Sequence, residues 1–198
     1  MKKKYIVIAV LIAVAFIAYR LSAGNYNSLV ALEEEVNAQW SQVQNLYQER
    51  YDKIPNLVAT VKGYARHEET VFTEIAEARS KAGGVVNIDS SILDDEQKLA
   101  EFQKVQDSLG ASLQRLLAVT ESYPSLKANE NFLALQAEIS ESENKISLER
   151  RRFNEKARSY NTSIRTFPKN IVASFAGFKS KAYFESVQGS ETAPKVEF

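Results

Sequence analysis

The 198-residue chain contains no cysteine, and it has few of the residues that interrupt helices. Without cysteine there is no disulfide, no thiolate nucleophile, no zinc-thiolate site and no lipid anchor on a cysteine. Four prolines and seven glycines are too few for a turn-rich all-β fold, whereas the abundant Leu, Ala, Glu, Lys and Gln favour helices. The length suits one folded domain with an appendage. We therefore expect an all-α protein.

Recognisable catalytic and metal-binding signatures are also missing. A metal site would depend on His67, the only histidine, together with carboxylates. Di-iron bundles need two Glu-x-x-His motifs, and Tyr64 stands where the one possible glutamate would be. Ser-His-Asp triads, phosphate-binding glycine loops and paired catalytic carboxylates have no local signature. We expect no cofactor, no metal and no enzymatic activity.

Acidic residues are missing from the N-terminal region, where Lys2, Lys3, Lys4 and Arg20 flank the apolar run 5–19. Without these four, the remaining 21 basic residues face 25 acidic ones, so the rest of the chain carries a net charge of −4. A mildly acidic body without a basic face argues against nucleic acid as a partner.

The apolar run is about 22 Å long as a helix, which is short for a hydrocarbon core of about 30 Å. Extended to Ala23 it has 19 residues, and Arg20 and the lysines can reach the two interfaces. We predict a membrane anchor at residues 1–23 that contacts the lipid bilayer through 5–23. The lysines place the N-terminus in the cytoplasm and the body outside it, at the inner membrane.

Two alternatives stay open for this segment. A cleaved signal peptide also begins with basic residues and a short apolar stretch, although Arg20 and Leu21 suit its cleavage site poorly. A helix buried within the protein is the other alternative.

In three further segments, mostly apolar and aromatic residues recur at alternating spacings of four and three, which is the pattern of helices that pack in a bundle. Each such series of positions is called a seam. The first runs from 36 to 78 in phase through Pro55, the second from 99 to 123 and the third from 132 to 167. Residues 24–185 are therefore predicted to form an elongated antiparallel helix bundle after the transmembrane helix.

Three shorter stretches complete this organisation. Residues 83–91, GGVVNIDSS, are the most loop-like internal stretch. Beyond Pro168 the chain can add a short helix, and residues 186–198 are predicted to be a loose tail.

Helix lengths indicate how many segments the bundle has. Helices over 26–65 and 128–167 would each be about 60 Å long, whereas one over 26–82 would be about 85 Å and would outrun its partners. A break between Gly63 and His67 would give four antiparallel segments of matching length. The unbroken phase of the first seam argues for one continuous helix instead.

Pro55 lies within a predicted helix. A proline there removes one backbone donor and its ring collides with the carbonyl of Tyr51, at a cost of about 3 kcal/mol, so we expect a bend. The bend either wraps a long helix over the bundle, which we favour, or presents an opened carbonyl to a ligand or partner.

Arg50, Glu143 and Arg150 occupy seam positions that are otherwise mostly apolar or aromatic. Buried charges need partners. These residues either form an internal ion pair or turn to the rim of the bundle, or they form a polar ligand site inside it.

Four aromatic residues follow the last long seam: Phe175, Phe178, Tyr183 and Phe184. They either cap the end of the bundle or form an exposed contact for a partner or for the lipid surface.

Several stretches occur in a characteristic order: YNSLVALEEEVNAQWSQVQ at 26–44, RYDKIPNLVATVKGYARHEE at 50–69, YPSLKANENFLALQAEISESENKI at 123–146, RRRFNEKARSYNTSIRTFP at 150–168, then AYFES and APKVEF. Together they resemble the LemA family of bacterial membrane-anchored proteins over nearly the whole chain. The departures are Tyr51, where the family commonly has a basic or small residue, and FAGF at 175–178, where Phe-Gly-Phe is more usual.

The resemblance implies a single N-terminal membrane helix followed by an up-and-down bundle of four helices, and no established reaction. The family includes a relative implicated in forming the membrane compartments of magnetotactic bacteria. The signature positions that it carries over to this chain are Asp52, Pro55, Asn56, Gly63, Tyr64 and His67, with Arg150, Asn154 and Tyr160 on the last long helix.

Two functions agree with these features. The first is a membrane-tethered scaffold or interaction protein that binds protein partners or copies of itself and organises the membrane or envelope. The alternative is an extracytoplasmic ligand-sensing bundle with a pocket at Arg50, Glu143 and Arg150. Because only four residues precede the membrane helix, such a sensor would need a separate signal transducer.

Overall fold

The computed structural model describes residues 2–65, 67–83 and 89–185, and the described residues with regular structure are all helical. The elements are α1 (Lys2–Lys62), α2 (Glu69–Gly83), the 3-10 helix η1 (Ser90–Asp94), α3 (Glu96–Thr120), α4 (Pro124–Lys127), α5 (Glu130–Arg165) and α6 (Lys169–Ala176). The prediction of an all-α fold is confirmed.

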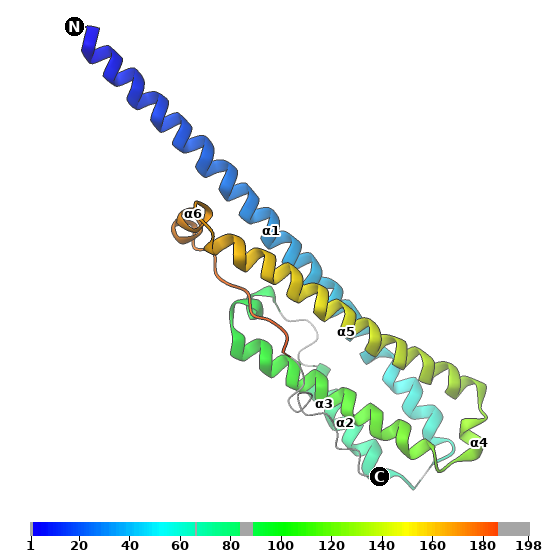
Figure 1. Ribbon diagram of the computed structural model, residues 1–198. Coiled ribbons are helices and arrows are strands. Elements are labelled where there is room, and N and C mark those ends of the chain that lie inside the picture. The colour runs from blue at the N-terminus through cyan, green and yellow to red at the C-terminus, as the bar shows by residue number, and fades with distance from the viewer. Residues whose placement is uncertain (1, 66, 84–88, 186–198) are drawn as a thin grey trace, which may run out of the picture.

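The long helices form an elongated bundle. α1 packs chiefly against α5, and α2 packs against α3. Figure 1 shows these two pairs running lengthwise beside each other, with α4 at one end and α6 at the other. The N-terminal part of α1 projects beyond the bundle at the α6 end (Figure 1).

The helix boundaries follow local capping chemistry. Asp95 caps α3 by accepting hydrogen bonds from the backbone N–H groups of residues 97 and 98, and Asn129 caps α5 by accepting from that of residue 132. Gly177 ends α6 in the left-handed conformation, with φ of 78°, which glycine adopts without a steric penalty.

The break predicted between Gly63 and His67 is confirmed, because α1 ends at Lys62 and α2 begins at Glu69. The last turn tightens, since the N–H of Gly63 donates to the carbonyl of Thr60. Helix α1 continues through Pro55, whose side chain is exposed. The bend at this proline stays a prediction.

The predicted seams form the core, and a polar layer divides that core into two apolar clusters. One cluster centres on Trp40, Phe102 and Phe153, and the other centres on residues such as Leu57 and Leu113. The three long helices α1, α3 and α5 therefore change from apolar to polar contacts at the same level of the bundle.

In the N-terminal part of α1, eight large apolar side chains that the structure describes have 52% to 70% of their surface accessible: Tyr5, Ile6, Val7, Ile8, Leu11, Ile12, Phe16 and Tyr19. Within the part of the chain that the structure describes, no helix is both long enough and apolar enough to cross a membrane. The anchor predicted at residues 1–23 stays a prediction.

The C-terminal part contains the short helix expected after Pro168, which is α6. Residues 178–185, here called the strap, follow it without helical structure. Of the loop expected at 83–91, Gly83 belongs to α2 and residues 90–91 belong to η1, so the expectation is wrong at these ends. Residues 84–88 and the tail predicted at 186–198 lie outside the described residues.

Candidate functional site

The polar layer between the two apolar clusters is the candidate site. Its central residue is Arg50 of α1, which is 1% exposed. Gln106 of α3 and Glu143 of α5 face it from the neighbouring helices. All three occupy seam positions, so the helical repeat that builds the core also brings them to one level of the bundle.

Arg50 is held by partners on two helices. Its Nη1 donates to Oε1 of Glu143 at 2.7 Å, and its Nη2 donates to Oε1 and to the backbone carbonyl of Gln106 at 2.8 and 3.1 Å. Arg50 and Glu143 thus form an internal ion pair, which is one of the arrangements considered from the sequence. The pair lies next to Gly110 of α3, where an added Cβ would be 3.6 Å from Nη1 of Arg50, an ordinary van der Waals distance.

A second arginine lies beside this layer. Arg150 of α5 donates from Nε to the hydroxyl of Tyr47 at 2.6 Å and from Nη2 to Oδ1 of Asp107 at 2.7 Å. The Tyr47 ring lies between the two arginines, with its centroid 5.3 Å from Cζ of Arg50 and 5.5 Å from Cζ of Arg150. Both cations therefore lie within cation–π range of one ring.

Burial raises the pKa of Tyr47 to about 12, and the charges of Arg150 and Arg50 oppose this rise only in part. Tyr47 is therefore neutral at physiological pH. The two arginines face two carboxylates, those of Glu143 and Asp107, so the charges of the network balance. A charge-balanced network of this kind holds neighbouring helices together.

A groove of about 630 Å³ opens beside these residues. Arg50, Asp107, Glu143 and Arg150 line it. Two buried donors at this level, Nε of Arg50 and Nε2 of Gln106, make no hydrogen bond within the described part of the chain. The groove has the size of a small-molecule site, and its donors would suit an anionic or carbonyl-bearing ligand.

Three side-chain amides hold the strap against the bundle. Asn154 donates to the carbonyl of Phe184 at 2.8 Å and accepts from its N–H at 2.9 Å. Asn161 makes the same pair of bonds with Lys181, both at 2.8 Å, and Gln103 makes it with Glu185 at 2.7 and 3.0 Å. The strap is thus bound through its backbone.

Two buried side chains of the strap also hold it against the bundle. Phe184 is 6% exposed and stacks on Trp40, and Lys181 forms ion pairs with Glu33 and Asp94. Phe184 is therefore part of the core beside the polar layer, and it does not cap the end of the bundle, which was one expectation from the sequence. Phe175 of the preceding helix α6, in contrast, is 91% exposed.

Tyr160 lies near the strap and is fully buried. Its hydroxyl makes no hydrogen bond to any residue that the structure describes. Burial raises the pKa of this hydroxyl, and the charges of Glu33 and Asp94 raise it further. Tyr160 is therefore neutral at physiological pH, and its ring supports the strap end by an edge contact with Phe178.

The other predicted residues do not join the polar layer. Asp52 accepts a hydrogen bond from Gln48 on the exposed face of α1, and Asn56 is exposed. Gly63, Tyr64 and His67 lie around the turn between α1 and α2.

Two hydroxyl groups connect this turn to the residues that flank α4, between α3 and α5. The hydroxyl of Tyr64 accepts from Nδ2 of Asn129 at 3.0 Å, and that of Tyr123 donates to Glu68 at 2.9 Å. His67 is exposed. Within the described residues no group of His, Asp and Glu side chains could hold a metal ion.

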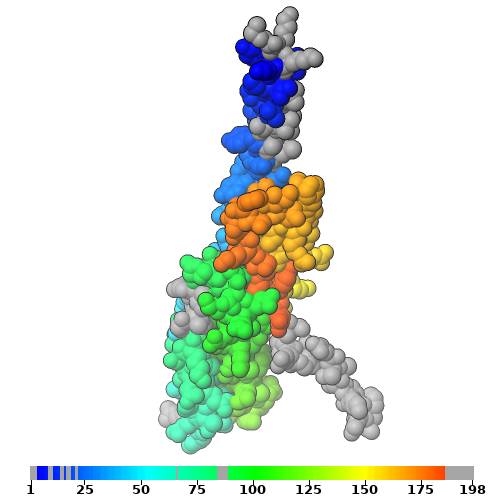
Figure 2. Space-filling model, turned by 90° about the vertical axis from the view of Figure 1, so that its left-hand side faces the viewer, coloured from blue at the N-terminus to red at the C-terminus, as the bar shows by residue number. Residues whose placement is uncertain are grey.

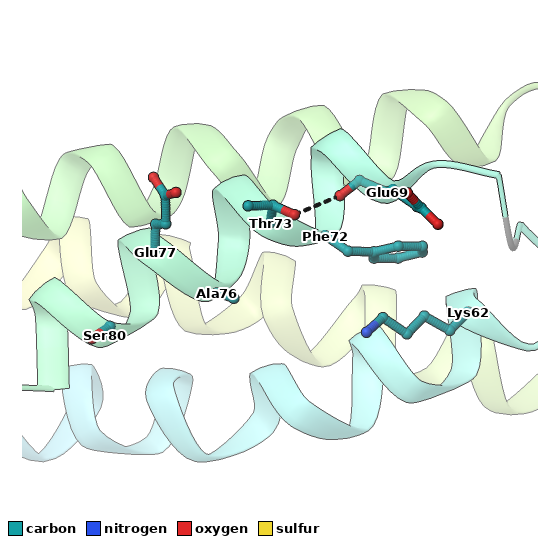
Figure 3. Close-up of a pocket in the computed structure, with 7 residues that line it drawn as sticks. All are labelled: Lys62, Glu69, Phe72, Thr73, Ala76, Glu77 and Ser80. Carbon is teal, nitrogen blue, oxygen red and sulfur yellow. Dashed lines mark hydrogen bonds between the residues drawn. The ribbon is translucent and has the colours of Figure 1, made fainter.

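A second groove, of about 700 Å³, lies between the end of α1 and α2. Figure 3 shows the Lys62 side chain opposite the Phe72 ring across this groove, and Thr73 bonded to the carbonyl of Glu69. Nζ of Lys62 is 5.1 Å from the ring centroid. No motif in the sequence marks this groove.

Three functional residues were not predicted from the sequence: Tyr47 and Asp107, which bind Arg150, and Gln103, which binds the strap. Gln103, Gln106 and Asp107 follow each other at spacings of three and one on α3, so polar residues at and beside a seam were the available signal.

Comparison with known proteins places these observations in a family context. The model of the LemA family matches residues 39–198. The magnetosome protein MamQ 2 of Paramagnetospirillum magneticum is 28% identical over 94% of this chain and 73% of its own length, and MamQ of Magnetospirillum gryphiswaldense is 27% identical over 93% and 73%. Protein LemA of Metamycoplasma hominis is 28% identical over 93% of this chain and 80% of its own.

Proposed function

Because this chain belongs to the LemA family, we propose that it is a membrane-tethered scaffold that organises a membrane by binding partners or copies of itself, and that it is not an enzyme. One observation carries this proposal. The apolar run 5–19 and the core seam of the bundle belong to a single helix, α1, of 61 residues. At about 1.5 Å per residue this helix is about 90 Å long.

A continuous helix would make the tether rigid. With residues 5–23 in the bilayer, α1 would hold the bundle upright at a fixed distance from the lipid, because no flexible linker separates the two. The lysines at 2–4 would keep the N-terminus in the cytoplasm and the bundle outside it, at the inner membrane. Rigid projection suits a spacer or an assembling coat better than a freely diffusing domain.

The named relatives support a role at membranes. Two of them are called magnetosome proteins, and a magnetosome is a membrane-bounded compartment. The balanced charges of the polar layer support a structural role for the bundle itself, since a paired network holds helices in register.

Membrane attachment is tested with the full-length chain in isolated membranes. We expect it to resist alkaline carbonate extraction, and the variant Leu11→Arg/Ile12→Arg to be extracted, because charges in the apolar run are costly in hydrocarbon. Leu133→Arg, at an exposed apolar site of the bundle, is the matched control. Extraction of the unaltered chain would contradict the tether.

Topology and self-association are tested with single cysteines, which the cysteine-free chain makes unambiguous. A cysteine at the exposed Ser125 should react with a membrane-impermeant maleimide in spheroplasts, as expected for an extracytoplasmic bundle.

Crosslinking in native membranes should yield dimers or larger species. A monomer with no co-purifying partner would contradict the scaffold.

A second function has one specific observation in its favour, the groove lined by Arg50, Glu143 and Arg150. A ligand-sensing bundle would bind a small anion there and pass the signal to a separate transducer. Thermal unfolding with inorganic phosphate and short dicarboxylates tests it. Stabilisation that Arg150→Met abolishes would support a sensor, and an unchanged midpoint with every anion would exclude these ligands.

A further inference from the structure

We propose that α6 is a second lipid contact, a short helix that lies on the bilayer surface beside the point where α1 leaves the bundle. The inference rests on the proposed membrane tether and adds a surface to it. Its occupant is the interface of a bilayer that contains anionic lipid.

The first support is an apolar face on α6 that no described residue covers. Phe175 is 91% exposed and Ile171, one helical turn before it, is 49% exposed. Phe167, just before the helix, is 76% exposed. The opposite face is packed on the bundle, because Ala173 is 4% exposed and Val172 contacts the core. An amphipathic helix with aromatic residues outward is typical of interfacial membrane binding.

The second support is the position of α6 along α1. Nζ of Lys169 donates to Oγ of Ser28 at 2.8 Å, and the rings of Tyr26 and Phe178 are 5.7 Å apart. Figure 2 shows α6 and the end of α5 as a shoulder directly beneath the projecting part of α1. The apolar face of α6 and the apolar run of α1 are thus neighbours on one end of the molecule.

Helix geometry places this shoulder at the depth of the lipid headgroups. Ser28 is five residues beyond Ala23, which is about 7.5 Å along α1. The headgroup region of each leaflet is about 5 to 8 Å thick. If residues 5–23 fill the hydrocarbon core, α6 meets the bilayer where amphipathic helices bind.

Charge points to the same occupant. The chain has no acidic residue between 1 and 32 or between 165 and 184, whereas Arg20, Arg165 and Lys179 are exposed basic residues at this end. Exposed basic side chains beside an apolar face favour an anionic bilayer. The remaining body is acidic, so its charge would keep the other surfaces away from such a bilayer.

Depth-dependent fluorescence quenching tests the inference in the full-length chain. Trp40 is the only tryptophan, so Trp40→Phe provides a silent background. Single tryptophans then replace Phe175 on α6, Phe16 in the apolar run and Leu133, whose side chain is 48% exposed on α5. The proteins are reconstituted in vesicles of phosphatidylcholine and phosphatidylglycerol that carry a quencher either near the headgroup or near the acyl-chain end.

We expect the tryptophan at 175 to lose more emission to the headgroup quencher, the one at 16 to lose more to the acyl-chain quencher, and the one at 133 to keep its emission with both. Circular dichroism confirms that each variant retains its helix content. The variant Ile171→Ser in the same background should weaken the quenching at 175 and leave that at 16 unchanged.

The outcomes separate this inference from the tether. Quenching at 16 without quenching at 175 overturns the lipid contact of α6 and leaves the tether standing. Quenching at 175 without quenching at 16 supports the contact and contradicts the tether. A blue shift at 175 that depends on protein concentration, without quenching, would mean that protein covers α6, and it overturns the lipid contact.

Discussion

Arg50 and Glu143 lie 93 positions apart in the chain, and their side chains form an ion pair of 2.7 Å inside the bundle. The pair lies between two apolar clusters, where polar residues interrupt the apolar seams of α1 and α5. Sliding one helix by a turn would leave a buried charge without its partner. We infer that the pair fixes the register of α1 on α5, which is the best-attested use of buried polar groups.

Removing one partner of this pair should destabilise the bundle, and replacing both should not. Glu143→Ala leaves the Arg50 cation with Gln106 alone, so we expect the free energy of unfolding to fall by about 2 kcal/mol. The double variant Arg50→Met/Glu143→Leu should recover most of that loss. Urea unfolding in detergent micelles measures both.

The matched control is Arg115→Met, which breaks the exposed ion pair between Arg115 and Glu74. We expect it to stay within roughly 0.5 kcal/mol of the unaltered chain. If the double variant is as unstable as Glu143→Ala, the pair itself contributes net stability. That outcome would contradict the inference that it serves mainly to fix the register of α1 on α5.

Tyr47 should make the bundle sensitive to alkaline pH. Its pKa is raised to about 12 by burial, whereas an unfolded tyrosine has a pKa of about 10. The folded state therefore keeps the proton longer than the unfolded state. The resulting stability is fully present below pH 10 and is lost as the pH rises from 10 to 12, by about 2 kcal/mol in all.

The comparison with Tyr47→Phe isolates this effect, because the variant lacks the titrating group and keeps the other tyrosines. Its free energy of unfolding should start lower, since Arg150 loses an acceptor, and should then fall less steeply between pH 10 and 12. Parallel curves for the two proteins would show that Tyr47 does not ionise differently in the folded state.

The strap should loosen locally when its amide partners are removed. Asn154→Leu takes away both bonds to Phe184, and Asn161→Leu takes away both bonds to Lys181. We expect each change to cost about 1–3 kcal/mol. Hydrogen exchange should rise first at the N–H of Phe184 in one variant and at that of Lys181 in the other, so each variant is the control for its counterpart.

Equal acceleration at both N–H groups in both variants would mean that the strap opens as one unit. Unchanged exchange in both variants would show that the side chains of the strap, Phe184 above all, hold it without the amides.

Local patterns predicted most of the fold. The alternating steps of four and three located the helices and the charged seam positions, because heptad periodicity depends only on spacing along one helix. The break after Lys62 followed from matching helix lengths. These features need no knowledge of which residues meet across the bundle.

Cross-bundle partners could not be predicted in this way. Asp107 lies off the seam, and only the packing of α3 brings it to Arg150. The amides of Asn154 and Asn161 bind a segment without helical periodicity, whose path depends on the assembled bundle. The sequence indicated that Arg50 and Arg150 needed partners, but only the tertiary structure shows which residues those partners are.

Pro55 remains the clearest local conflict with helix, since α1 continues through it. Replacing it with alanine restores a donor to the carbonyl of Tyr51 and removes the clash, so Pro55→Ala should raise the free energy of unfolding by about 1–3 kcal/mol. Asn56→Ala, at the exposed neighbouring position, should gain only about 0.5 kcal/mol from helix propensity. Urea unfolding measures both gains, and crosslinking of the same variants in membranes reports on partners. A stabilised variant with unaltered crosslinks supports a purely structural bend. Loss of the crosslinks without a gain in stability would instead mean that the opened carbonyl serves a partner.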